Sequence, residues 1–91
     1  MSKTKKDIKS FPGEAVVKDV AEIGEIVRQL RKAGKLTQVE TAAMCRVGTR
    51  FLSDLENGKP TLHLGKAMQV LRDFGLLVIL RKKGLSNVRH A

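Results

Sequence analysis

Glycine interrupts this sequence of 91 residues at short intervals, so that no segment between the interruptions is long enough for more than a short helix. The main interruptions fall at Gly34, Gly48, Gly58 and Gly75. Between them, apolar residues recur at steps of three and four, which is the spacing of a helix that buries one face. A chain of this length has room for one small core. The pattern therefore predicts several short helices packed around that core.

The first predicted helix covers about residues 20 to 33. Its apolar residues are Val20, Ile23, Val27 and Leu30, and the basic residues lie mostly on the other face. Gly34 is expected to end this helix in a left-handed conformation, which glycine adopts without a steric penalty.

A second and a third helix are expected on either side of a short break at residues 46–48. Thr37 and Glu40 have the spacing of a capping box, in which each side chain binds the backbone amide of the other. This places the start of the second helix at Thr37. The third helix is expected from Thr49 to Asn57, with Gly58 as its terminator.

A fourth helix is expected after the turn at residues 59–61, with Thr61 as its N-cap and Gly75 at its end. Its buried face is expected to contain Leu64, Ala67, Met68, Leu71 and Phe74. The sequence therefore predicts an all-α fold, a compact domain of four to five helices over residues 15–75.

The segment 76–82 begins with an unbroken apolar run and lacks helical spacing, which predicts a β-strand. An unpaired strand is an aggregation hazard, and the other extended candidate, residues 14–17, is short. We therefore expect this strand to pair with its counterpart in a second copy, through Leu76, Val78 and Leu80, and to form a symmetric homodimer. Two alternatives remain: a longer fourth helix, or pairing within the chain.

The second and third helices, with the tight turn between them, have the organisation of a helix-turn-helix. The third helix has an aliphatic inner side, with Leu52 and Leu55, and a polar outer side, with Thr49, Arg50 and Asp54. In this motif the second helix of the pair enters the major groove and its polar side chains meet the edges of the bases. The pattern thus predicts a protein that binds double-stranded DNA.

Residues 36–60 resemble the Xre and lambda-repressor-like helix-turn-helix family. The matching positions are Leu36, Thr37, Gln38, Ala42, Val47, Ser53, Glu56 and Gly58. The resemblance covers about residues 20–75 and implies a lambda-repressor-like fold. Two positions depart from the family pattern, because Arg46 stands where the turn glycine is usual and Thr41 where leucine is usual.

Within that family, residues 51–61 and the strand that follows the fourth helix look most like the HipB-type antitoxins. This resemblance implies an autoregulating repressor that binds an inverted-repeat operator as a dimer, with a HipA-like kinase toxin as its partner. Two alternatives stay open. One is a phage-type or Xre-type repressor without a toxin partner, and the other is a protein-interaction module whose main task is toxin neutralisation.

Position in the motif, together with side-chain chemistry, suggests which residues contact DNA. The residues expected to contact bases are Gly48, Thr49, Arg50, Ser53 and Asp54. The residues expected to contact phosphates are Lys35, Thr37, Gln38, Arg46, Asn57 and Lys59. Arg50 is the first candidate, because a guanidinium can bind O6 and N7 of guanine together. Glu56 is expected to be structural and to pair with Arg28 or Arg31 of the first helix.

The net charge of +9 is concentrated at the ends of the chain: residues 1–10 carry +3 and residues 81–91 carry +4. We interpret residues 1–14 and 83–91 as basic tails. A basic surplus favours a polyanionic partner such as DNA, although such tails are also common as solvated extensions.

Several other classes of protein are disfavoured by the residue content. A single cysteine, Cys45, allows no internal disulfide and no cysteine zinc cluster, and His63 and His90 are too far apart to suggest a metal site. The sequence contains no recognisable catalytic pattern, so neither an enzyme nor a cofactor is expected. An aromatic content of 3% argues against single-strand stacking, and no apolar run is long enough to span a membrane. A cytoplasmic, nucleoid-associated protein is expected.

Overall fold

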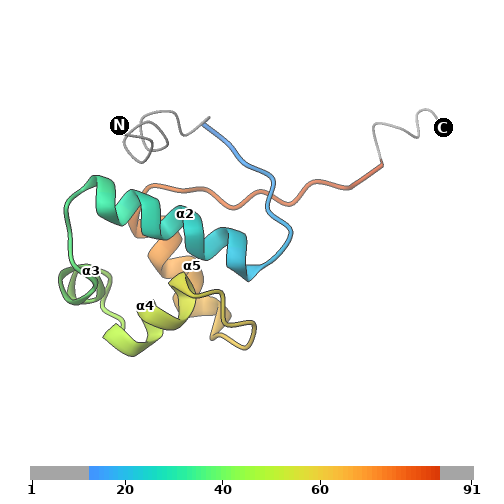
Figure 1. Ribbon diagram of the computed structural model, residues 1–91. Coiled ribbons are helices and arrows are strands. Elements are labelled where there is room, and N and C mark those ends of the chain that lie inside the picture. The colour runs from blue at the N-terminus through green and yellow to red at the C-terminus, as the bar shows by residue number, and fades with distance from the viewer. Residues whose placement is uncertain (1–12, 85–91) are drawn as a thin grey trace.

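The computed structural model describes residues 13–84, and within them the chain forms four helices (Figure 1). Numbered as in Figure 1, they are α2 (Val20–Ala33), α3 (Gln38–Cys45), α4 (Thr49–Glu56) and α5 (Leu64–Asp73). The predicted all-α class is therefore confirmed over the described part of the chain. Helix α2 crosses above α3 and α4, and α5 lies behind it (Figure 1). Most of each predicted tail, residues 1–12 and 85–91, falls outside the described residues.

Helix α2 begins at the N-cap Asp19, whose carboxylate accepts a hydrogen bond from the amide of Glu22 at 3.1 Å. The prediction for its other end was wrong in one detail. Gly34 keeps a right-handed conformation with φ −83°, and Lys35 adopts the left-handed one with φ 59°. The turn closes with a hydrogen bond of 3.1 Å from the amide of Leu36 to the carbonyl of Arg31. The left-handed position thus lies one residue later than the sequence suggests.

Helices α3 and α4 follow the predicted boundaries closely. The capping box is confirmed, because the Thr37 hydroxyl accepts from the Glu40 amide at 3.0 Å and the Glu40 carboxylate accepts from the Thr37 amide at 2.8 Å. Arg46 ends α3 in the left-handed conformation, and Gly48 is the N-cap of α4. The turn of the helix-turn-helix thus contains a strained non-glycine residue.

The start of α5 differs from the prediction. His63, and not Thr61, is the N-cap, and its Nδ1 accepts a hydrogen bond from the Lys66 amide at 3.2 Å. Leu62 packs against the core, so the connection from α4 needs two more residues before the helix begins. Ala67 is buried as expected, but Leu64 and Met68, also expected to be buried, are exposed by 71% and 36% because α5 turns Val70 toward the core in their place.

The core lies where α2, α3, α4 and α5 meet. Its buried apolar residues are Val27, Ala42, Cys45, Leu52, Leu55, Ala67 and Val70. Helix α2 lies close against α4 at Gly24, where an added Cβ would overlap the backbone oxygen of Leu55. A side chain at this position would push the two helices apart, so glycine is required here.

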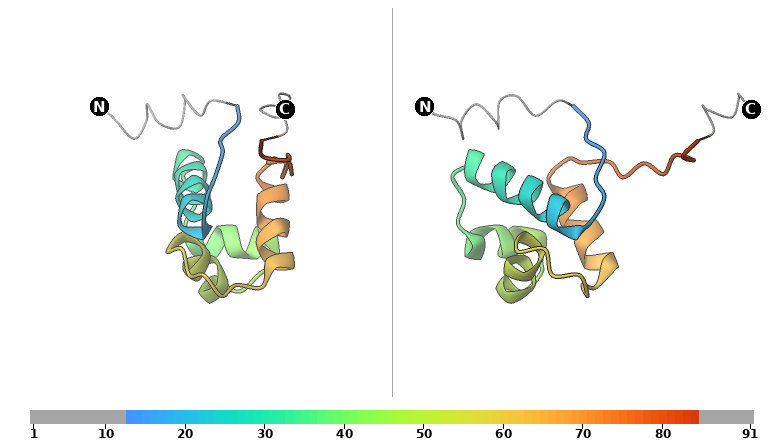
Figure 2. Two further views of the ribbon diagram at one scale, coloured as in Figure 1. Left: turned by 90° about the vertical axis from the view of Figure 1, so that its right-hand side faces the viewer. Right: turned by 45° about the vertical axis from the view of Figure 1, so that its right-hand side comes forward.

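Residues 76–84 leave the end of α5, run across the top of the helices and project beyond them at their far end (Figures 1 and 2). The alternative of a longer fourth helix is wrong, because α5 ends at Asp73 and Gly75 has φ 81°. Within the described residues, no backbone hydrogen bond joins this segment to residues 14–17. Leu77 and Leu80 are exposed by 86% and 94%. Pairing with a second copy stays a prediction.

None of the helices in residues 13–84 has both the length and the apolar character that crossing a membrane demands.

Candidate nucleic-acid interface

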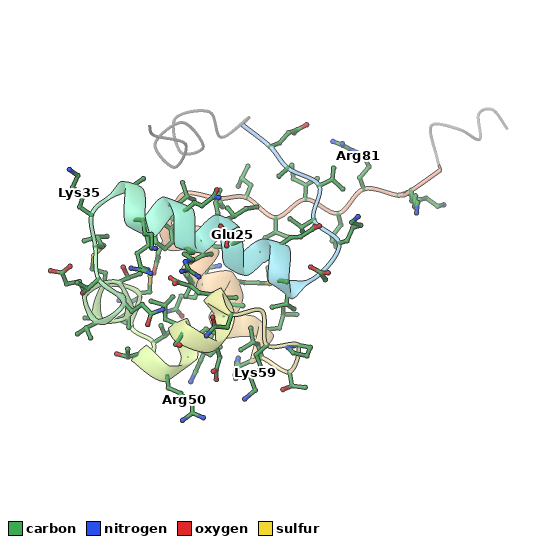
Figure 3. All side chains as sticks on the ribbon, viewed as in Figure 1. Glu25, Lys35, Arg50, Lys59 and Arg81 are labelled. Atoms are coloured by element: carbon green, nitrogen blue, oxygen red, sulfur yellow. The ribbon has the colours of Figure 1, made fainter. Side chains whose placement is uncertain are left out.

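The N-terminal half of α4 presents polar groups to solvent. Gly48, Thr49 and Arg50 are exposed, while Ser53 and Asp54, one turn later, are half-buried. The Arg50 side chain is 88% exposed and points away from the helices (Figure 3). No side chain caps the start of α4, so its first amides remain free to bind an anion. The five residues expected to contact bases thus lie on one short stretch of backbone.

Asp54 lies between two basic side chains of this surface. Its Oδ2 is 3.8 Å from Nε of Arg50 and 3.6 Å from Nζ of Lys59. Arg50 and Lys59 point to the same side of the molecule (Figure 3). Such exposed ion pairs contribute about 0 to 1 kcal/mol to the stability of the fold, so Asp54 holds neither cation strongly. Both remain available to an anionic partner, and Asp54 keeps them close together.

The start of α3 carries two residues expected to contact phosphates. Gln38 donates from Nε2 to Oε1 of Glu56 at 3.0 Å, which leaves its second N–H free to donate elsewhere. Thr37 accepts the capping hydrogen bond through its hydroxyl oxygen, so its hydroxyl proton is also free. Both free donors lie at the N-terminus of a helix, where the helix dipole favours an anion.

A buried ion pair fixes these elements relative to one another. Arg31 binds both carboxylate oxygens of Glu56, through Nε at 2.7 Å and Nη2 at 2.9 Å, and the two side chains are only 10% and 2% exposed. Its Nη1 also donates to the backbone oxygen of Leu36 at 2.8 Å. Because Glu56 also binds Gln38, the network joins α2, the α2–α3 loop, α3 and α4. The expected structural role of Glu56 is thereby confirmed, with Arg31 as its partner.

The other residues expected to contact phosphates are more scattered. Arg46 and Asn57 are exposed at the C-terminal caps of α3 and α4. Lys35 lies at the turn between α2 and α3, far from Arg50 and Lys59 in the view of Figure 3. The structure therefore brings Arg50 and Lys59 together at one surface and leaves Lys35 apart from them.

Two residues of α3, Cys45 and Thr41, lie inside the core with a polar atom on their side chains. Cys45 is buried, as expected, and burial raises the pKa of its thiol, with the Asp73 carboxylate adding to the rise. Thr41 is completely buried, and its hydroxyl has no hydrogen-bond partner among the described residues. The sequence signal for Thr41 was its departure from the family pattern, where leucine is usual.

Residues 27–76 match the helix-turn-helix family model. The chain belongs to the helix-turn-helix family. This confirms the family resemblance found in the sequence. The chain is also similar to an uncharacterized HTH-type transcriptional regulator, y4mF, of Sinorhizobium fredii, with 44% identity over 68 residues. The alignment covers 75% of this chain and 90% of that protein.

A solved structure called MDT Protein shares the fold, with a TM-score of 0.67 and 17% identity. The match covers 77% of this chain and 99% of that one. At this level of identity the likeness supports the arrangement of the helices alone.

Proposed function

We propose that this DNA-binding regulator is a sequence-specific repressor that inserts α4 into the major groove. The proposal rests on the exposed polar half of α4. Leu52 and Leu55 anchor the opposite side of this helix in the core, and the hydrogen bond from Arg31 to Glu56 holds its end. The relative from Sinorhizobium fredii is described as an HTH-type transcriptional regulator, which supports the same role.

Base recognition is assigned to the first turn and a half of α4. Arg50 binds O6 and N7 of a guanine, and Thr49 contacts a thymine methyl group. Ser53 and Asp54 lie one turn further along, where Asp54 accepts from N4 of cytosine when it is released from Arg50. Gly48 allows the backbone to approach the DNA closely, because it has no side chain at the start of the helix.

Phosphate contacts are assigned to groups on both sides of α4. Thr37 and Gln38 bind one phosphate through the start of α3, and Arg46, Asn57 and Lys59 bind along the flanking backbone. Lys35 contributes only if the DNA extends to the far side of α3. These contacts position the protein without reading sequence.

The repressor acts as a homodimer on an inverted repeat. The support is the extended segment 76–82, which exposes Leu80 and Val78 and forms no strand hydrogen bond within the described residues. Two copies paired through this segment satisfy one backbone edge of each copy and bring these side chains together across the pair. Their recognition helices would then meet successive major grooves about 34 Å apart.

The experiment that tests sequence reading begins with selection of bound fragments from random DNA. Arg50→Ala and Arg50→Lys are then compared on the selected site and on a site changed at its guanine. We expect Arg50→Ala to weaken binding to the selected site by about 1 to 3 kcal/mol and to lose the preference for guanine. Arg72→Ala, a change at an exposed arginine of α5, is the matched control. Unchanged affinity and specificity of Arg50→Ala would overturn the assignment.

A kinase toxin of the HipA type is the proposed partner, and the support is the resemblance of residues 51–61 to the HipB-type antitoxins. The test is whether the neighbouring open reading frame encodes a kinase-like protein that co-purifies with this chain. A regulator that represses its own promoter without such a partner would instead be a stand-alone repressor. A chain that neutralises the kinase but binds no DNA would be an interaction module.

A further inference from the structure

The C-terminal end of α4 places Lys59 beside the Asp54 carboxylate. The amide of Lys59 donates to the carbonyl of Asp54 at 3.0 Å, and the amide of Gly58 donates to the carbonyl of Leu55 at 3.0 Å. These two bonds form a Schellman motif, in which Gly58 takes the left-handed conformation with φ 76°. The turn brings Nζ of Lys59 to 3.6 Å from Oδ2 of Asp54. Because the motif uses only the backbone of Asp54, replacing its side chain leaves the turn in place.

Arg50 lies next to the same carboxylate. Arg50 and Asp54 are four residues apart, so their side chains meet on one face of α4. Nε of Arg50 is 3.8 Å from Oδ2 of Asp54, which is too long for a hydrogen bond. Among residues 13–84, the oxygens of Asp54 form two ion pairs without accepting a hydrogen bond. The N–H groups of Arg50 and the oxygens of Asp54 thus stay available, side by side, to a partner.

A G·C base pair presents a matching pattern in the major groove. Guanine offers two acceptors, N7 and O6, and the paired cytosine offers a donor, N4–H, directly beside them. O6 and N4 are hydrogen-bonded to each other within the base pair, so they lie about 3 Å apart. This separation is close to the 3.8 Å between Nε of Arg50 and Oδ2 of Asp54. The two side chains can therefore meet the acceptors and the donor of one base pair together.

The other three arrangements of a base pair match these side chains less well. An A·T pair has thymine O4 where cytosine offers N4–H, and a reversed C·G or T·A pair has the purine N7 there. With Arg50 in the groove, the Asp54 carboxylate would face an acceptor in each case. A desolvated carboxylate without a donor weakens binding, so Asp54 acts against these sequences.

We propose that Arg50 and Asp54 read one G·C base pair together, and that Asp54 determines the specificity for its cytosine. Arg50 binds N7 and O6 of the guanine, and Asp54 accepts from N4 of the cytosine paired with it. As Arg50 turns from Asp54 to the guanine, Lys59 stays beside the carboxylate and offsets its charge. The inference rests on the proposed insertion of α4 into the major groove, and adds that both contacts fall on the same base pair.

The test measures the affinity of the full chain for the selected site by fluorescence anisotropy, with single modified bases in the duplex. Base changes combined with Arg50→Ala first locate the guanine. N4-methylcytosine opposite this guanine keeps the base pair and puts a methyl group where Asp54 accepts, so wild-type binding should weaken about tenfold. Inosine in place of the guanine is the matched control, because it keeps N7 and O6 and lacks only the minor-groove amine. It should change the affinity by less than about twofold.

Asp54→Ala should make the chain indifferent to the methyl group, because the acceptor that the methyl group blocks is gone. This variant should bind the unmodified and the N4-methylcytosine duplexes with equal affinity. Glu25→Ala removes the same charge from α2, away from Arg50 and Lys59 in Figure 3. It should keep the full sensitivity of the wild type to N4-methylcytosine.

An unchanged wild-type affinity for the N4-methylcytosine duplex would overturn the proposal. An equal loss in Asp54→Ala would do so too, since it assigns the effect to the methyl group itself, and a loss confined to methylation of a neighbouring pair would reject the single base pair. In these cases Arg50→Ala still weakens the selected site, so the proposed function stands. A wild type without preference for the selected site rejects both. Should Asp54→Ala fail to fold by circular dichroism, the wild-type affinities for the two modified duplexes decide alone.

Discussion

Arg31 of α2 and Glu56 at the end of α4 form a two-point ion pair in the interior, 25 residues apart in sequence. The same carboxylate accepts from Gln38, and the same guanidinium donates to the Leu36 carbonyl. When an arginine binds a carboxylate through two hydrogen bonds and both groups form further hydrogen bonds, the desolvation cost of burying the ion pair is largely offset. Helix α4 is thus attached to α2 and to the start of α3.

Glu56→Ala should lower the free energy of unfolding by about 3 to 5 kcal/mol, because it leaves the Arg31 guanidinium buried without its partner. Urea unfolding followed by circular dichroism measures the effect. Glu25→Ala is the matched control, since Glu25 is exposed and, among residues 13–84, hydrogen-bonds with Gln29 alone. It should change stability by less than about 0.5 kcal/mol. The double variant Arg31→Met with Glu56→Leu should lose less than Glu56→Ala. If Glu56→Ala and Glu25→Ala lowered the free energy of unfolding equally, the buried ion pair would contribute no more to stability than an exposed hydrogen bond.

Lys59→Ala should weaken binding to all DNA sequences alike and reduce the slope of log affinity against log salt by about 1. The reason is that a lysine near a phosphate acts as a point charge and releases one counterion on binding. Fluorescence anisotropy between 50 and 200 mM salt measures both effects. Lys35→Ala, at the separate turn between α2 and α3, should leave the slope unchanged. A loss confined to one sequence would instead assign Lys59 to base reading.

Leu80→Asp should convert the proposed homodimer to a monomer while leaving the fold of each chain intact. Leu80 is 94% exposed in the single chain, so its replacement removes no packing from the domain. In a paired ribbon, the same change places like charges near each other across the two copies. Sedimentation over a range of concentrations measures the assembly. Leu64→Asp, at an exposed leucine of α5, is the control and should stay dimeric. A wild-type chain that remains monomeric at high concentration would exclude the dimer.

The raised pKa of Cys45 predicts a loss of stability in alkaline solution. A group whose pKa is higher in the folded state stabilises that state fully below its unfolded pKa, and the contribution is lost as pH rises through the folded pKa. The ordinary thiol value is 9.0, so the wild type should lose stability relative to Cys45→Ala only above about pH 9. Unfolding of both proteins at matched pH values measures the difference. A constant difference up to pH 11 would contradict the raised pKa.

Local sequence signals located the helices well because each signal is completed within a few residues. The capping box of Thr37 and Glu40 closes over three residues, and the glycine after α4 ends that helix directly. Which face of a helix turns toward the core depends instead on contacts with residues far away in the sequence. The exposure of Leu64 followed from the way α5 meets α3, which no pattern within residues 61–75 reveals.

The parts of the candidate interface that sequence reasoning missed all depend on contacts between helices. Gly24 lies in the middle of a helical pattern, and only the approach of Leu55 shows why it has no side chain. Gln38 was assigned to phosphate binding by position, but its hydrogen bond to Glu56 needs the ends of α3 and α4 to meet. A glycine inside an amphipathic helix was the available signal for the first case.

Arg46 should have opposite effects on stability and on DNA binding when it is replaced by glycine. A φ of 58° costs a residue with a Cβ about 1 to 2 kcal/mol, and glycine avoids this cost. Glycine also gives the unfolded chain more conformational freedom, which offsets part of the gain in stability. Arg46→Gly should therefore stabilise the fold by up to about 1 kcal/mol. Its affinity for DNA should fall at all sequences, because a proposed phosphate contact is lost.

Arg46→Ala separates the backbone from the side chain at this turn, since it removes the cation and keeps the strain. It should lose DNA affinity as Arg46→Gly does, without the gain in stability. Lys35→Gly is the complementary control, because Lys35 has φ 59° but lies away from Arg50. It should gain stability and keep its DNA affinity. If Arg46→Gly and Arg46→Ala proved equally stable, the left-handed turn at Arg46 would carry no strain that glycine relieves.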